Sequence, residues 1–220
     1  MSLGRLGLAL IGIDLLRKQH PGPVAPAPPA RLGGPRAQTA YVRTMEDRRR
    51  LIHAAMKRGA EDPDVIALTR RVLSRPCGDG LCLRQKDWKG YITALYDWFC
   101  ANMLYVPDPV IGWKDGGPLG IDMYADPGRT LFDTHAGDCD CLVAAFGAMC
   151  MSVGFPMATS ILHTYATDEY PQGLDHILPL VGLPPDAPEY WLPCDVTESK
   201  WPGWFPAQGL IETREDRIVE

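Results

Sequence analysis

The chain lacks a membrane-length apolar run, a surplus of basic residues and a regular cysteine framework. The apolar stretch at residues 3–16 contains Asp14, is too short to span a bilayer, and is followed by no small-residue cleavage site. The 22 Lys and Arg against 27 Asp and Glu give a formal charge of −5, which argues against a nucleic-acid partner. Seven unevenly spaced cysteines favour a reduced, cytosolic-type protein over a disulfide-stapled secreted one.

The N-terminal part of the chain differs in composition from the rest. Residues 20–38 are dominated by Pro, Ala and Gly, which is typical of an extended linker. We therefore predict an apolar N-terminal segment and linker over residues 1–38 and one domain over residues 39–220. The apolar segment is interpreted as a short amphipathic element that docks on a partner surface, with disorder as the alternative.

The spacing of apolar residues predicts helices first and strands later. Helices are expected at residues 44–58, 64–74, 86–104 and 139–152, with Asp62 and Pro63 starting the second and Gly154 ending the fourth. Strands are expected at residues 157–166, 175–182 and 189–197, and residues 105–136 are expected to form a long loop over a cleft. This order predicts an α+β fold with helices packed on a small antiparallel sheet.

Cys77 and Cys82 flank a short Gly-Asp-Gly-Leu segment. They are spaced so that a disulfide or a metal ion would close a small loop between them. No second Cys/His pair at zinc spacing accompanies them, so an unpaired loop is the favoured interpretation.

Cys139 is the strongest candidate for a reactive side chain. It lies in Gly137-Asp138-Cys139-Asp140-Cys141, directly before an apolar helical pattern. The unpaired N–H groups and the positive dipole end of a helix N-terminus favour a thiolate, which is the nucleophilic form. The alternative is a small buried side chain, which we expect for Cys150 within the same helix.

A general base and an orienting carboxylate are also available downstream. Of the five histidines, His20 and His53 are expected to be solvated, and His135 lies near the predicted cleft. His176 is favoured over His163 because a catalytic base belongs at a strand end that faces the nucleophile helix. Asp195 is expected to close the last strand, where it would accept the second imidazole N–H or would merely cap the chain locally.

These residues carry a resemblance to a known family. Residues 137–141, the helix end at 154–158, the histidine strand at 175–180 and the Trp…Asp-x-Thr strand at 191–197 resemble the motifs of the transglutaminase-like cysteine hydrolase superfamily. The helix ending in residues 97–108 is also similar. The resemblance covers roughly residues 62–200, and its closest pattern is that of small members encoded by tailed phages and prophages. The chain departs from the pattern at four positions beside the triad: Cys141, Ile177, Leu178 and Val196.

The resemblance implies a papain-like core and a catalytic triad of Cys139, His176 and Asp195. It implies a cysteine peptidase, amidase or transglutaminase that acts on a protein or peptide amide. Trp98 is our candidate for a second oxyanion donor or a cleft wall, with core packing as the alternative. No cofactor, metal or nucleic acid is expected.

A third interpretation, metal binding by Cys139, Cys141 and His176, is disfavoured because side chains two apart on a helix diverge. The rival hypothesis is a catalytically silent fold that serves in phage assembly through residues 1–38. The expected location is the cytoplasm, or the virion if the protein is phage-encoded.

Overall fold

The computed structural model describes residues 45–74, 76–77, 80–81, 83–108, 110–114, 117–120, 124–165, 175–206 and 211–219. The predicted N-terminal segment and linker lie outside these residues. The side chains of Cys77 and Cys82 also lie outside them, so the hypotheses about both regions stay predictions.

The four predicted helices are confirmed. They are α1 (Met45–Ala60), α2 (Pro63–Leu73), α3 (Trp88–Asn102) and α5 (Cys139–Met151). Asp62 caps α2 by accepting a hydrogen bond from the backbone N–H of Asp64, and Pro63 occupies the first turn, where a missing N–H is tolerated. After α5, Gly154 takes a φ of +91°, as expected for the left-handed residue that ends a helix.

The sheet has four antiparallel strands in the order β10-β7-β8-β9. The expected strands correspond to β7 (Met157–Thr164), β8 (Asp175–Leu183) and β9 (Tyr190–Pro193). The fourth, β10 (Ile211–Ile218), pairs with β7 and was not predicted. The prediction that Asp195 closes a strand was wrong: β9 ends at Pro193, and Asp195 lies outside regular structure, just before the turn at residues 196–199.

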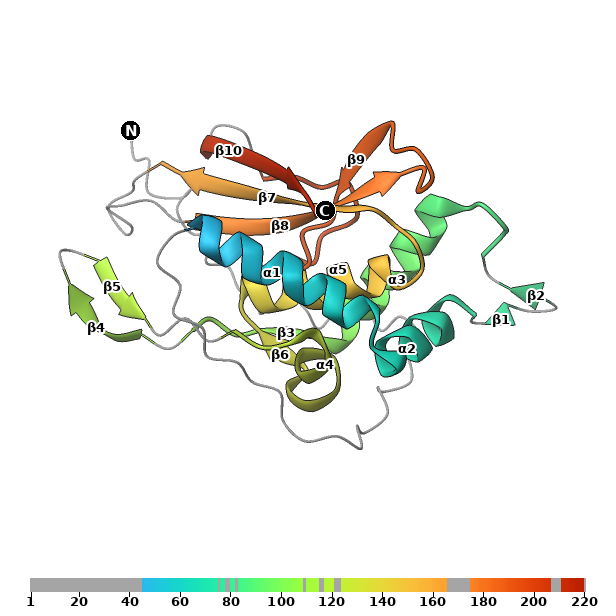
Figure 1. Ribbon diagram of the computed structural model, residues 1–220, viewed down its shortest axis with the longest axis horizontal. Coiled ribbons are helices and arrows are strands. Elements are labelled where there is room, and N and C mark those ends of the chain that lie inside the picture. Colours follow the sequence, from blue (N-terminus) through green and yellow to red (C-terminus); the bar gives the residue numbers. More distant parts are fainter. Residues whose placement is uncertain are drawn as a thin grey trace, which may run out of the picture.

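Helix α5 is the centre of the core. All of its residues from Asp140 to Cys150 are buried. In Figure 1, α1 crosses in front of α5, and α5 packs against α1, α3 and β8. A helix that is apolar on every side is stable only when it is surrounded, which explains why the other helices cover it. The α+β fold class, with helices on a small antiparallel sheet and Cys139 at a helix N-terminus, is therefore confirmed.

The segment predicted as a long loop contains several short elements. Strand β3 (Leu104–Tyr105) pairs in parallel with β6 (Ala136–Gly137), and between them lie β4 (Val110–Lys114), β5 (Gly117–Gly120), α4 (Pro127–Arg129) and a π-helical turn at Thr130–Thr134. A further pair, β1 (Pro76–Cys77) and β2 (Gly80–Leu81), precedes α3. The β3–β6 pair joins the end of α3 to the start of α5, so it helps to fix the position of Cys139. No helix in the described part of the chain has the length and apolar character that crossing a bilayer requires.

His53 is not solvated as predicted, because α1 packs on the face of β7. Its Nε2 lies 2.8 Å from the hydroxyl of Thr159, a fully buried residue of β7. Burial, with the nearby charges of Arg49 and Lys57, lowers the pKa of His53 from 6.5 to about 4. His53 is therefore neutral at pH 7 and forms part of the contact between α1 and the sheet.

We expect this contact to make the protein sensitive to mild acid. The folded-state pKa lies below the unfolded value, so the unfolded chain binds the proton first, and the stability that His53 provides is lost as the pH falls from 6.5 to about 4. The loss should be on the order of 1–2 kcal/mol for this half-buried group. Urea unfolding at about pH 7 and about pH 5 measures it. His53→Gln, which keeps a hydrogen-bonding group, should flatten the dependence, and an unchanged slope would contradict this assignment.

Candidate active site

Cys139 is the first residue of α5. Asp138 caps the helix: its Oδ1 accepts a hydrogen bond of 3.2 Å from the backbone N–H of Cys141. The Cys139 side chain is half-buried, whereas Cys141 and Cys150 are buried. Cys139 therefore lies at the open end of the core helix.

His176 and Asp195 lie beside Cys139. The side chains of Cys139 and His176 lie close enough to interact, since each one shifts the pKa of the other. His176 Nε2 lies 2.8 Å from Oδ2 of Asp195. Since Nε2 is engaged by the carboxylate, Nδ1 is the ring nitrogen left for the Cys139 thiol. The structure thus brings together the three residues that the sequence analysis selected.

Asp195 is held on every side although it lies outside regular structure. It is 1% exposed, and its Oδ1 accepts hydrogen bonds from the hydroxyl and the backbone N–H of Thr197 at 2.7 and 3.1 Å. This leaves Oδ2 for His176. The Tyr96 hydroxyl, from α3, donates to the backbone carbonyl of Asp195 at 2.7 Å. Asp195 is therefore fixed both at its carboxylate and at its backbone.

We expect Tyr96→Phe to lower the free energy of unfolding by about 1–2 kcal/mol, because a buried carbonyl loses its donor while the ring is kept. The ring packs edge-to-face on Phe146, and that contact should persist. Urea unfolding measures the change. Tyr91→Phe is the matched control, since Tyr91 is a half-buried tyrosine of the same helix that packs on Trp88. Equal effects of the two substitutions would show that the Tyr96 hydroxyl has no special role.

The charges of the three residues are coupled. Burial alone would lower the pKa of His176, but the charge of Asp195 and the hydrogen bond with it raise that pKa well above 6.5. Burial opposes ionisation of Asp195, yet His176 and Thr197 together lower its pKa. The sequence analysis expected the helix N-terminus to favour the thiolate of Cys139. In the folded protein burial raises the pKa of this thiol, and His176 acts in the opposite direction. Ionisation of Cys139 therefore depends on His176.

Two other histidines have contacts of their own. His163 on β7 binds Asp175 through Nδ1 at 2.5 Å, so it has a carboxylate partner of its own. His135 follows the π-helical turn in a left-handed conformation, with φ of +50°, and its backbone carbonyl accepts from the N–H of Leu104. Neither replaces His176 as the partner of Cys139.

Trp98 lies in the core and is 3% exposed. Its indole N–H has no hydrogen-bond acceptor among the described residues. A buried N–H without an acceptor costs about 1–3 kcal/mol, so its persistence calls for an explanation. The role of Trp98 as an oxyanion donor or a cleft wall stays a prediction.

Cys141 contacts a different part of the chain from Cys139. Its thiol accepts a hydrogen bond of 3.2 Å from the backbone N–H of Ala125, and burial raises its pKa. A Cβ on Gly137 would lie 2.6 Å from the Cβ of Cys141, which explains why the turn before the helix needs glycine.

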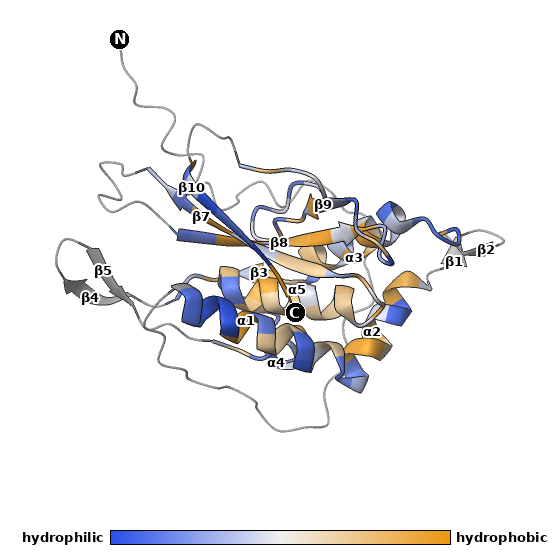
Figure 2. Ribbon diagram, turned by 45° about the horizontal axis from the view of Figure 1, so that its top comes forward, coloured by the Kyte–Doolittle hydropathy of each residue, from blue (hydrophilic) through white to orange (hydrophobic). Residues whose placement is uncertain are grey.

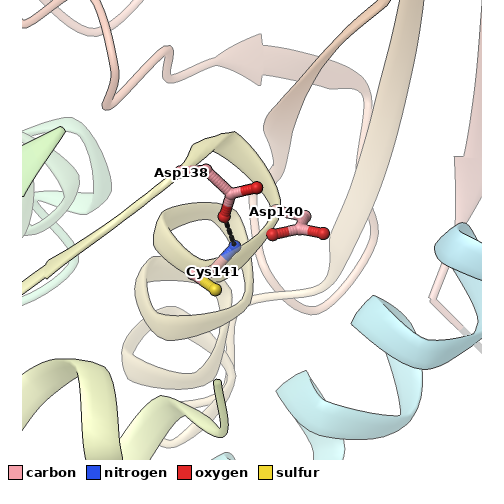
Figure 3. A group of neighbouring side chains, drawn as sticks. All are labelled: Asp138, Asp140 and Cys141. Carbon is pink, nitrogen blue, oxygen red and sulfur yellow. Dashed lines mark hydrogen bonds between the residues drawn. The ribbon is translucent and has the colours of Figure 1, made fainter. Parts of the chain in front are cut away.

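The described side chains that lie close enough together to hold a metal ion are Asp138, Asp140 and Cys141, shown in Figure 3. This set differs from the metal-binding set considered from the sequence, which combined Cys141 with Cys139 and His176. Asp138 already serves as the helix cap, as the dashed line in Figure 3 shows, and the raised pKa of Cys141 keeps its thiol protonated. We therefore interpret the group as part of the structure of the helix N-terminus.

Comparisons with known proteins give similarity at the level of structure only. No family model and no curated protein matches the chain. Among solved structures, it is similar to a chain described as a cysteine protease from Cytophaga hutchinsonii, with 13% identity, a TM-score of 0.44, and coverage of 76% of this chain and 50% of that one. It is also similar to the periplasmic domain of TgpA from Pseudomonas aeruginosa bound to ethylmercury, with 18% identity, a TM-score of 0.41, and coverage of 66% and 49%. The chain thus spans about half the length of the structures it matches.

Proposed function

We propose that the protein is a transglutaminase-like cysteine hydrolase or acyltransferase that acts on an amide bond of a protein or peptide. The observation that carries the proposal is that Cys139, at the N-terminus of a core helix, interacts with His176, whose Nε2 is hydrogen-bonded to the buried carboxylate of Asp195. A nucleophile, a base and an orienting group in this arrangement are the parts that acyl transfer requires.

In the first half of the reaction, His176 Nδ1 takes the proton of the Cys139 thiol and the thiolate sulfur attacks the substrate carbonyl carbon. A C–S bond forms, and the carbonyl oxygen becomes an oxyanion. The Cys139 backbone N–H is one donor to it, and Trp98 is proposed as the second because its buried N–H has no acceptor among the described residues. Protonated His176 then gives its proton to the leaving amine as the C–N bond breaks, which leaves a thioester on Cys139.

In the second half, water or an amine resolves the thioester. His176 removes a proton from the incoming nucleophile, which adds to the thioester carbonyl, and Cys139 leaves as the thiol. Water gives a carboxylic acid, as in a peptidase or amidase, and an amine gives a new amide, as in a transglutaminase. Asp195 keeps the imidazole oriented and stabilises its charged form in both halves.

Mild alkylation tests the proposal. The full chain is treated with a small excess of iodoacetamide at about pH 6, and the modified cysteines are mapped by mass spectrometry. Cys139 should react far faster than Cys100, which is similarly half-buried and serves as the internal reference. The selectivity should disappear in His176→Ala and persist in His163→Ala.

Two outcomes would overturn the proposal. One is labelling of Cys139 no faster than Cys100, and the other is selectivity that survives in His176→Ala. Either would favour the rival hypothesis of a catalytically silent fold, such as a phage assembly protein.

A further inference from the structure

An open groove of about 650 Å³ runs between α1 and the end of β10. One face of α1 lines it, together with Arg217 and Ile218 of β10. In Figure 2, β10 is hydrophilic along most of its length, and α1 has hydrophilic segments beside hydrophobic ones. The groove is lined by Glu46, Arg49, Arg50, His53, Ala54, Lys57, Arg58, Arg217 and Ile218.

The groove is positively charged although the chain as a whole carries −5. Five of its lining residues are Arg or Lys and one is Glu. Three carboxylates neutralise part of this charge. Glu46 binds Arg49 and Arg50, Glu215 binds Arg49, and Asp126 binds Arg58. Five positive against three negative groups leave a net charge of 5 − 3 = +2.

Two of the cations, Lys57 and Arg217, are exposed and have no carboxylate partner among the described residues. They lie on the two different sides of the groove, one on α1 and the other on β10. A ligand that contacts both must therefore lie across the groove. Their positive charges are therefore available to bind that ligand.

The wall of the groove formed by α1 includes buried polar groups. The Arg49 side chain is only 3% exposed, and its Nε has no hydrogen-bond partner among the described residues. His53 is held by Thr159, and the charges of Arg49 and Lys57 help to keep it neutral, while Glu46 acts in the opposite direction. A negative charge placed here would oppose the effect of Arg49 and Lys57, and it would therefore raise the pKa of His53.

We propose that this groove binds an acidic, extended polypeptide segment of a partner protein. The lining residues span positions 46–58 of α1, which is roughly 18 Å and has room for about five or six residues of extended chain. Spaced carboxylates would face Lys57 and Arg217, and an apolar residue would contact Ile218, which is 57% exposed at one end. A nucleic-acid strand fits less well, because the residues that line the groove include no Phe, Tyr or Trp on which its bases would stack.

Titration of the full chain with a hexaglutamate peptide tests this inference. Binding should raise the pKa of His53 above about 4, which is followed by its imidazole NMR signals, and it should weaken as salt is added. Lys57→Gln with Arg217→Gln should weaken binding roughly tenfold. Arg70→Gln with Arg71→Gln is the matched control, since both arginines are exposed in α2 outside the groove. None of these substitutions touches the proposed triad.

Three results would overturn the inference. The first is that hexaglutamate leaves the His53 signals unchanged, and the second is that both double variants weaken binding equally. The third is that a DNA or RNA oligonucleotide binds at least tenfold more tightly than hexaglutamate through the same residues, which would exclude the acidic polypeptide as the partner class.

Discussion

Asp195→Ala is expected to lower the free energy of unfolding by about 3–5 kcal/mol. The carboxylate is 1% exposed and accepts hydrogen bonds from His176 and from the hydroxyl and backbone N–H of Thr197. Removal of the carboxylate leaves these donors without an acceptor in the protein interior, and it leaves any positive charge on His176 without a counter-charge. Urea unfolding at about pH 7 measures the effect. Asp133→Ala, at an exposed aspartate, is the control and should change stability by no more than about 0.5 kcal/mol.

The pH dependence of this effect has a definite sign. The pKa of Asp195 is lowered in the folded protein, so the stability it provides is present above its unfolded value of 3.8 and is lost as the pH falls through the folded value. The difference in stability between wild type and Asp195→Ala should therefore shrink in strong acid. A variant that is as stable as Asp133→Ala would contradict the buried ion pair. If Asp195→Ala fails to fold, Asp195→Asn keeps the shape of the side chain, and its rate of Cys139 alkylation should still fall.

Cys139→Ala and His176→Ala are each expected to reduce acyl transfer by roughly a thousandfold or more. The first removes the nucleophile. The second leaves a thiol whose burial raises its pKa and that has no base to take its proton. Hydrolysis of a fluorescently labelled casein, or incorporation of a fluorescent amine into it, measures the loss. His163→Ala is the control, since His163 has its own partner in Asp175.

The two residues should behave as one unit. Because neither accelerates the reaction without the other, the double variant should be no slower than the single ones. Losses that multiply in the double variant, or activity that persists in Cys139→Ala, would show that the reaction does not pass through a thioester on this cysteine.

Local signals explain what could be predicted from the sequence. Asp62 with Pro63, and Gly154 with Pro156, mark helix ends because capping and left-handed backbone depend only on neighbouring residues. The apolar run after Cys139 identified the core helix, because this signal also lies in neighbouring residues of the sequence. The selection of Cys139, His176 and Asp195 came from the local pattern around each residue and from the family resemblance, and the structure places them together.

Properties that arise from distant contacts could not be predicted. Strand β10 is almost entirely polar, since Glu, Thr, Arg and Asp fill it between Ile211 and Ile218, and only its pairing with β7 makes it a strand. His53 was expected to be solvated because nothing near it in the sequence indicates Thr159 as its partner. The raised pKa of Cys139 likewise depends on burial by elements far along the chain.

The hydrogen bond between Tyr96 and Asp195 joins residues 99 positions apart, and the proposed chemistry depends on contacts between residues as distant as these. Ribosomes make Cys139 before His176 and Asp195, so a nascent chain that stops short of residue 175 carries the thiol without its base. Contacts between such distant residues form late in folding, because a long loop must close first. Partly made or partly unfolded molecules would then carry an ordinary cysteine, and nucleophilic power would belong to the finished fold alone.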